Sequence, residues 1–154
     1  MSSKISEQQV ELLEVTLDIE VAATIDVVWE TVLEQLGPLL TCGKDHPILD
    51  MKLEPWPGGR WFRDLGNNTG QLWGHVQSIQ PPELLELHGP MMFSAAVISH
   101  ATFRLTEAGG LTRIDFSHRA VGLIPDELRD GAAVTAGWVN YFAKLRAGVE
   151  WRLR

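Results

Sequence analysis

The sequence predicts an α+β domain in which a curved antiparallel sheet of about six or seven strands wraps around a long C-terminal α-helix. Three observations lead to this fold class. Near the N-terminus an alternating segment is followed by one with helical periodicity, the middle of the chain carries strand patterns at hairpin spacing, and the C-terminal segment returns to helical periodicity. No repeat or linker interrupts this order, so one domain accounts for nearly the whole chain.

The first strand and the first helix are predicted from a change in the spacing of apolar residues, from every second position to helical spacing. The segment LEVTLDIEV alternates apolar and polar residues, which predicts a half-buried strand over 13–21. The next segment has apolar residues at helical spacing, with Thr24 as a candidate N-cap and Asp26 in the first turn, where a carboxylate is favourable. Gly37 and Pro38 end this predicted helix.

Residues 48–120 carry strand patterns separated by turns rich in Pro, Gly and Asn, such as PWPGG and GNNTG. Because short turns join the neighbouring strands, the predicted sheet is antiparallel. Side chains alternate between the two faces of a strand, and the more polar set is expected to face outward. The residues expected to face the helix are Ser99, Ala101, Phe103, Leu105, Thr112, Ile114, Phe116 and His118.

The C-terminal segment predicts one long helix that begins near Pro125 and extends for about 40 Å. Its glycines at 131, 137 and 148 make it weak as an isolated helix, so it must pack on the sheet. The stripe expected at the contact consists of Leu128, Thr135, Trp138, Phe142, Leu145 and Val149.

Composition narrows the class of protein. The chain has 154 residues and a net charge of −7, and that negative charge argues against a nucleic-acid partner. Cys42 is the only cysteine, so no internal disulfide forms, which suits a reducing compartment. No signal peptide and no membrane span are expected, and the predicted location is cytoplasmic. Residues 1–13 are expected to form a flexible N-terminal segment, followed by a single domain over 14–154.

Five segments also carry a likeness to known proteins by their order and spacing: VAATIDVVWETV, PWPGGRWF, WGHVQSIQPPELLEL, ATFRLTEAGGLTRIDFSH and GWVNYFAKLRAGVE. Together, over residues 14–151, they resemble the helix-grip fold of the START-like, birch-pollen-allergen-like (SRPBCC) superfamily. Within it, the chain is similar to the branch named for the activator of heat-shock-protein-90 ATPase. The superfamily contains lipid carriers, polyketide cyclases and co-chaperones, so the resemblance implies a fold and leaves several functions open.

A sheet that grips a helix tends to leave a cavity beside it, and we expect a ligand to lie there. Pockets of this kind are mostly apolar with a few polar groups. The candidate ligand-binding residues are Trp61, Arg63, Trp73, Met92, Phe116, His118, Trp138 and Phe142.

Each candidate has a structural alternative. His118 is a core histidine whose ring is hydrogen-bonded to a nearby backbone or side-chain group, a hydrogen-bonding point for a ligand, or a proton donor in cyclase-like chemistry. Arg63 either reaches the cavity mouth with its charged end or anchors an anionic group. The aromatic residues serve as core, as cavity wall, or as both. Met91, Met92 and Phe93 follow Gly89-Pro90 at an expected hairpin tip, where they pack under the last helix, border a pocket or meet a partner.

The first functional hypothesis is a non-enzymatic module that binds a small hydrophobic or amphipathic molecule. The first alternative is a co-chaperone-like activator of the heat-shock-protein-90 ATPase, which the resemblance implies, with a chaperone as partner. The second is a polyketide cyclase-like enzyme that would use His118 with Arg63 or Tyr141.

No cofactor and no metal site are expected, because the histidines and Cys42 show no ligand spacing. Strand edges and the Met–Phe tip make a homodimer a further prediction.

Overall fold

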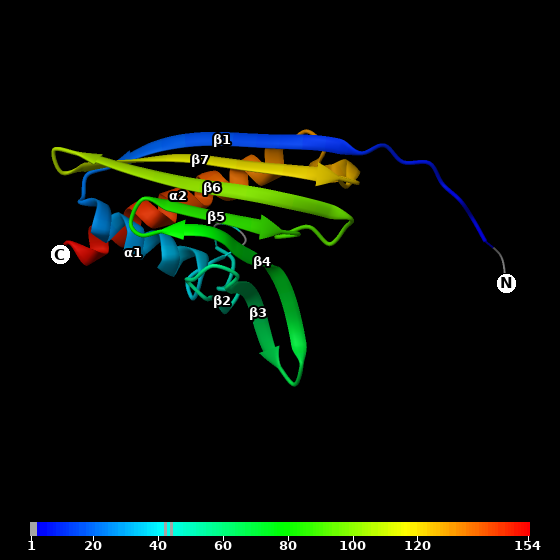
Figure 1. Ribbon diagram of the computed structural model, residues 1–154, viewed down its shortest axis with the longest axis horizontal. Helices are drawn as coiled ribbons and strands as arrows, with labels where there is room; N and C mark the ends of the chain where they lie inside the picture. Colours follow the sequence, from blue (N-terminus) through cyan, green and yellow to red (C-terminus); the bar gives the residue numbers. More distant parts are fainter. Residues whose placement is uncertain (1–2, 42, 44) are drawn as a thin grey trace.

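The computed structural model of the chain describes residues 3–41, 43 and 45–154. Cys42 therefore lies outside the described residues. Residues 3–10 form no helix or strand and extend away from the body of the domain, and β1 begins at Glu11 (Figure 1). The elements in chain order are β1 (Glu11–Val21), α1 (Ile25–Leu36), β2 (Met51–Leu53), β3 (Arg60–Gly66), β4 (Thr69–Gln80), β5 (Leu84–Gly89), β6 (Val97–Ala108), β7 (Leu111–Gly122), the 3₁₀ turn η1 (Asp126–Leu128) and α2 (Ala132–Arg152).

The strands form one seven-stranded sheet in the order β1-β7-β6-β5-β4-β3-β2, and every neighbouring pair is antiparallel. Figure 1 shows both helices on one side of this sheet, and α1 packs against α2. The hairpin of β3 and β4 bends away from the other strands. This architecture confirms the predicted α+β helix-grip fold.

Strand parity places the core where the sequence predicts it. On β6 and β7 the residues expected to face the helix are all buried, and their neighbours in sequence are less buried or exposed. Burial of the apolar members of this set is the main stabilising contribution to the fold. A cluster of aromatic rings with centroids 4.5 to 6.3 Å apart fills the centre of this layer, and its members are Phe103, Phe116, Trp138, Tyr141 and Phe142.

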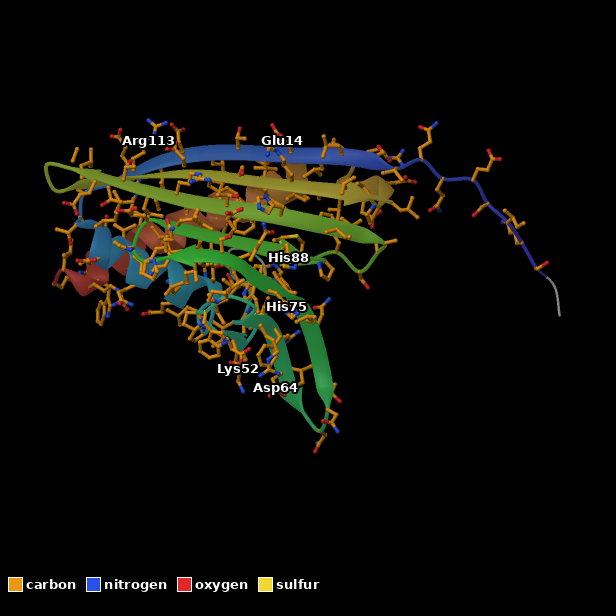
Figure 2. All side chains as sticks on the ribbon, in the orientation of Figure 1. Glu14, Lys52, Asp64, His75, His88 and Arg113 are labelled. Atoms are coloured by element: carbon orange, nitrogen blue, oxygen red, sulfur yellow. The ribbon has the colours of Figure 1, made fainter. Side chains whose placement is uncertain are left out.

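The outer face of the sheet carries charged and polar side chains together with an exposed apolar row formed by Leu12, Val121 and Ile98, which stand opposite one another on β1, β7 and β6. Arg113 bonds Asp18 across β7 and β1, and Arg119 bonds Glu14 in the same way. Three histidines stand directly opposite one another on β4, β5 and β6, namely His75, His88 and His100. The rings of the first two lie 6.1 Å apart and are labelled in Figure 2.

The C-terminal helix is shorter than the sequence predicts. It begins at Ala132 and not near Pro125, and its 21 residues span about 31 Å instead of 40 Å. Gly131 has a φ of 77°, which is a left-handed conformation that interrupts the helix after η1. The face of α2 that packs on the sheet also differs slightly from the predicted stripe. It includes Val134 and Tyr141, which are buried, whereas Thr135 is only partly buried.

In the segment after β5, Met91 and Phe93 pack into the core, which is one of the three alternatives that the sequence leaves open for this segment. The expected exposed Met–Phe tip does not exist, because the side chains of Met91 and Phe93 are 0% and 2% exposed. Met91 adopts a φ of 55°, and its backbone N–H donates to the Trp73 carbonyl. This turn folds the segment back onto the core. One of the two reasons for predicting a homodimer is thereby removed.

A candidate apolar cavity under the C-terminal helix

A cavity of about 140 Å³ lies between the first half of α2, the segment after α1, and the strands β3 and β4. Four of the eight candidate residues line it: Trp61, Trp73, Met92 and Trp138. The other lining residues are Leu40, Thr41, Leu128, Ala133, Val134, Gly137 and Tyr141.

The polar hydrogens on the aromatic walls are already bonded within the protein. The Trp61 indole Nε1–H donates to the Leu36 carbonyl at 2.8 Å, and the Tyr141 hydroxyl donates to the Val32 carbonyl at 3.0 Å. The Trp73 indole N–H donates to the side-chain oxygen of Gln71 at 2.9 Å, and that of Trp138 donates to His118. These bonds leave carbon surfaces facing the cavity, so the space favours an apolar guest.

An irregularity in the sheet places Trp61 and Trp73 at the same wall. The register of β3 and β4 shifts between Trp61 and Phe62, and Trp73 falls within the shift without a partner on β3. Such a bulge redirects a side chain that strict alternation would place elsewhere. The two rings meet edge to face with centroids 5.3 Å apart.

Small residues on α2 border the opening of the cavity. Ala133 and Gly137 are exposed, and both line the cavity. A Cβ atom built on Gly137 would meet nothing within 4 Å. A glycine inside a helix costs about 1 kcal/mol relative to alanine, and here it leaves the cavity open on the helix side.

His118 lies behind Trp138 and does not line the cavity. Its ring is fully buried, and its Nδ1 accepts the Trp138 indole N–H at 2.9 Å. Because an indole nitrogen can only donate, Nδ1 must be unprotonated, and the proton of the neutral ring resides on Nε2. Burial lowers the pKa of His118 from 6.5 to about 4. Burial also raises the pKa of the Tyr141 hydroxyl, so both groups are neutral at pH 7.

Three more candidate residues lie away from the cavity wall. Arg63 is half-buried, and its Nε donates to the Leu49 carbonyl at 3.0 Å. Phe116 and Phe142 are buried in the aromatic cluster with centroids 5.2 Å apart. The cavity therefore occupies one end of the layer between sheet and helix, and side chains fill the middle.

Sequence reasoning missed several wall residues. Tyr141 follows Trp138 by three positions, and this helical spacing was a usable signal that both rings share a face. Leu40 and Thr41 gave no such signal, because they belong to the connection between α1 and β2 and their position depends on tertiary packing.

The described residues form neither a cluster of metal ligands nor a helix that could span a membrane. Over 3–41, 43 and 45–154, no three His, Cys, Asp or Glu side chains are close enough to hold a metal ion. No helix in the same part of the chain is long and apolar enough to cross a membrane.

A family comparison agrees with this geometry. The model of the family described as activator of Hsp90 ATPase homolog 1-like protein matches residues 22–150. The chain belongs to this family. The family falls in the SRPBCC superfamily, so the resemblance seen in the sequence is confirmed. No curated protein matches the chain significantly.

Solved structures share the fold of this family member at low sequence identity. An uncharacterised protein from Rhizobium leguminosarum superposes with a TM-score of 0.73 and 19% identity, covering 94% of this chain and 99% of the other. The Zhui aromatase/cyclase from Streptomyces sp. R1128 superposes with a TM-score of 0.65 and 19% identity, covering 94% and 97%. CalU16 from Micromonospora echinospora has a TM-score of 0.61 and 16% identity, covering 95% and 87%. These similarities establish the fold alone.

Proposed function

We propose that the protein binds a small apolar molecule, or the apolar part of an amphipathic one, in the cavity under α2. One observation carries this proposal: a cavity of about 140 Å³ has aromatic walls whose polar hydrogens are all bonded within the protein. Apolar protein cavities of about 150 Å³ stay dry and bind molecules such as benzene. The gain comes from removing the ligand's apolar surface from water.

The volume limits the size of the ligand. Pockets for drug-sized ligands usually measure roughly 300 to 1,000 Å³. A cavity of about 140 Å³ accepts one aromatic ring or a short branched chain, and a larger ligand requires its walls to move. The cavity wall therefore suits a single-ring molecule better than a long lipid.

Binding accounts for this cavity better than catalysis does. Cyclase-like chemistry requires an acid or base that faces the substrate. The Tyr141 hydroxyl already donates to a backbone carbonyl. The Nδ1 lone pair of His118 accepts the Trp138 N–H, and burial lowers the pKa of the ring, so His118 is neither a free base nor a charged acid. The family name also suggests a chaperone partner, but the geometry of the cavity carries no argument for that alternative.

A variant that fills the cavity tests the proposal. Gly137→Leu adds a side chain at a wall position where a Cβ atom meets nothing within 4 Å, so the fold should tolerate it. Ala136→Leu is the matched control, because Ala136 is exposed on the same helix and does not line the cavity. Toluene is the probe, and its dissociation constant is measured by isothermal titration calorimetry.

We expect wild type and Ala136→Leu to bind toluene equally, and Gly137→Leu to bind it at least about tenfold more weakly. Equal binding by all three proteins would place the site elsewhere. No binding by wild type would reject the cavity as a ligand site.

A further inference from the structure

Two polar side-chain atoms on the inner face of the sheet have no hydrogen-bond partner among the described residues. They are Oγ of Ser99 on β6 and Nε2 of His118 on β7. Both side chains are 0% exposed. A buried polar group without a partner is costly, so native proteins rarely keep one without a reason.

The sheet register brings these two residues together. His118 stands opposite Ala101, and Ser99 stands opposite Ala120. Ser99 and His118 are therefore diagonal neighbours on the same face of adjacent strands, a spacing of about 7 to 8 Å between Cα atoms. The two side chains do not bond each other, and neither atom has another partner among the described residues.

The hydrogen-bonding pattern defines which kind of ligand atom the pair can bind. Since Nδ1 of His118 accepts the Trp138 N–H, the free Nε2 carries a proton and donates. The Ser99 hydroxyl can also donate. Two neutral donors suit a carbonyl or hydroxyl oxygen. A carboxylate would have to enter the core without an opposite charge, which is costly.

The pair lies one side chain away from the cavity. Trp138 separates the cavity from the pair, because one side of it lines the cavity and its indole N–H donates to His118. Phe93 follows Met92, a wall residue, and its ring centroid is 6.2 Å from that of His118. Trp138 is held by its hydrogen bond, whereas Phe93 belongs to a connection with no regular secondary structure. Of these two rings, Phe93 is therefore the one whose rotation would bring the polar pair within reach of the cavity.

We propose that Ser99 and His118 bind a neutral oxygen of the ligand, a carbonyl or hydroxyl group, while the ligand's apolar ring occupies the cavity under α2. This inference rests on the proposed function and makes it more specific. It assigns the ligand to the class of small aromatic ketones, phenols and alcohols. Entry of the oxygen requires the Phe93 side chain to rotate.

A pair of isosteric probes tests the assignment. Acetophenone carries a carbonyl oxygen, and α-methylstyrene has a CH₂ group at the same position. Their dissociation constants are measured by calorimetry for wild type, for Ser99→Ala and for the control Ser117→Ala, which changes a serine on the outer face of β7. We expect Ser99→Ala to weaken acetophenone relative to α-methylstyrene by about fivefold, the effect of one hydrogen bond. Ser117→Ala should leave the ratio unchanged.

A second measurement on wild type does not depend on a variant. In ¹⁵N NMR of the imidazole rings, acetophenone should shift the Nε2 signal of His118, and α-methylstyrene should not. If both probes bind, but the ratio and the Nε2 signal do not respond to the oxygen, the polar site is refuted and the cavity remains a ligand site. If neither probe binds wild type, the proposed function and this inference fail together.

Discussion

Acidification should destabilise the protein through His118. The ring is fully buried, and its Nδ1 accepts a bond from Trp138, so the folded state disfavours protonation. Its surroundings supply no compensating charge, because its cross-strand neighbours Ala101 and Val15 are apolar and the nearby ring of Phe93 is neutral. In the unfolded chain the ring protonates freely. Below pH 6.5 the unfolded state therefore binds more protons, and stability falls as the pH falls.

The magnitude follows from the two pKa values. A folded-state pKa of about 4 against an ordinary value of 6.5 corresponds to about 3 kcal/mol, since each tenfold change in a protonation equilibrium is worth about 1.4 kcal/mol. This stability is fully present above pH 6.5 and is lost progressively as the pH falls to about 4. Natural domains have only about 5 to 15 kcal/mol of stability, so the loss should be readily measured.

Urea denaturation of wild type and His118→Asn at pH 7 and pH 4 measures this effect. The Asn side-chain oxygen can still accept the Trp138 N–H, but it does not titrate. We expect wild type to lose about 3 kcal/mol more than the variant between the two pH values. Exposed carboxylates with a lowered pKa, such as Glu54 and Asp64, are present in both proteins and cancel. His88→Asn is the control on the outer face and should behave as wild type. Equal losses in wild type and His118→Asn would refute the reasoning.

Three further substitutions test the packing by denaturation at pH 7. Trp61→Ala should cost about 3 to 5 kcal/mol because the ring is fully buried, and a loss below about 1 kcal/mol would contradict its place in the core. Thr112→Val should cost about 1 to 3 kcal/mol because it leaves the Ala23 carbonyl without its 2.8 Å bond, and no change would mean that the bond contributes nothing. Gly137→Ala should raise stability by up to about 1 kcal/mol, and destabilisation would show that the site is more crowded than described.

The sequence was sufficient for the order of elements and for the faces of the long strands. Thr24 and Gly37 flank α1 as predicted, and two-residue periodicity on β6 and β7 separated buried from exposed residues correctly. These features are local, since each depends on residues within a few positions along the chain.

The remaining features depended on tertiary packing. The left-handed conformation of Gly131 shortened α2, and a lone glycine within a helical pattern does not reveal its φ angle. The bulge that directs Trp73 toward Trp61 breaks the two-residue rule that the parity argument used. The partner of His118 was also unpredictable, because Trp138 reaches it from an element 20 residues further along the chain.

The aromatic wall of the cavity gives the protein an intrinsic optical reporter. Trp61, Trp73 and Trp138 line the cavity, whereas Trp56 and Trp151 are 54% and 71% exposed. Trp29 is also buried but lies outside the cavity wall, so a guest in the cavity contacts three of the four buried indoles and leaves the exposed ones unchanged. Fluorescence emission from the buried group, isolated by quenching the exposed group with iodide, would therefore report occupancy without any label.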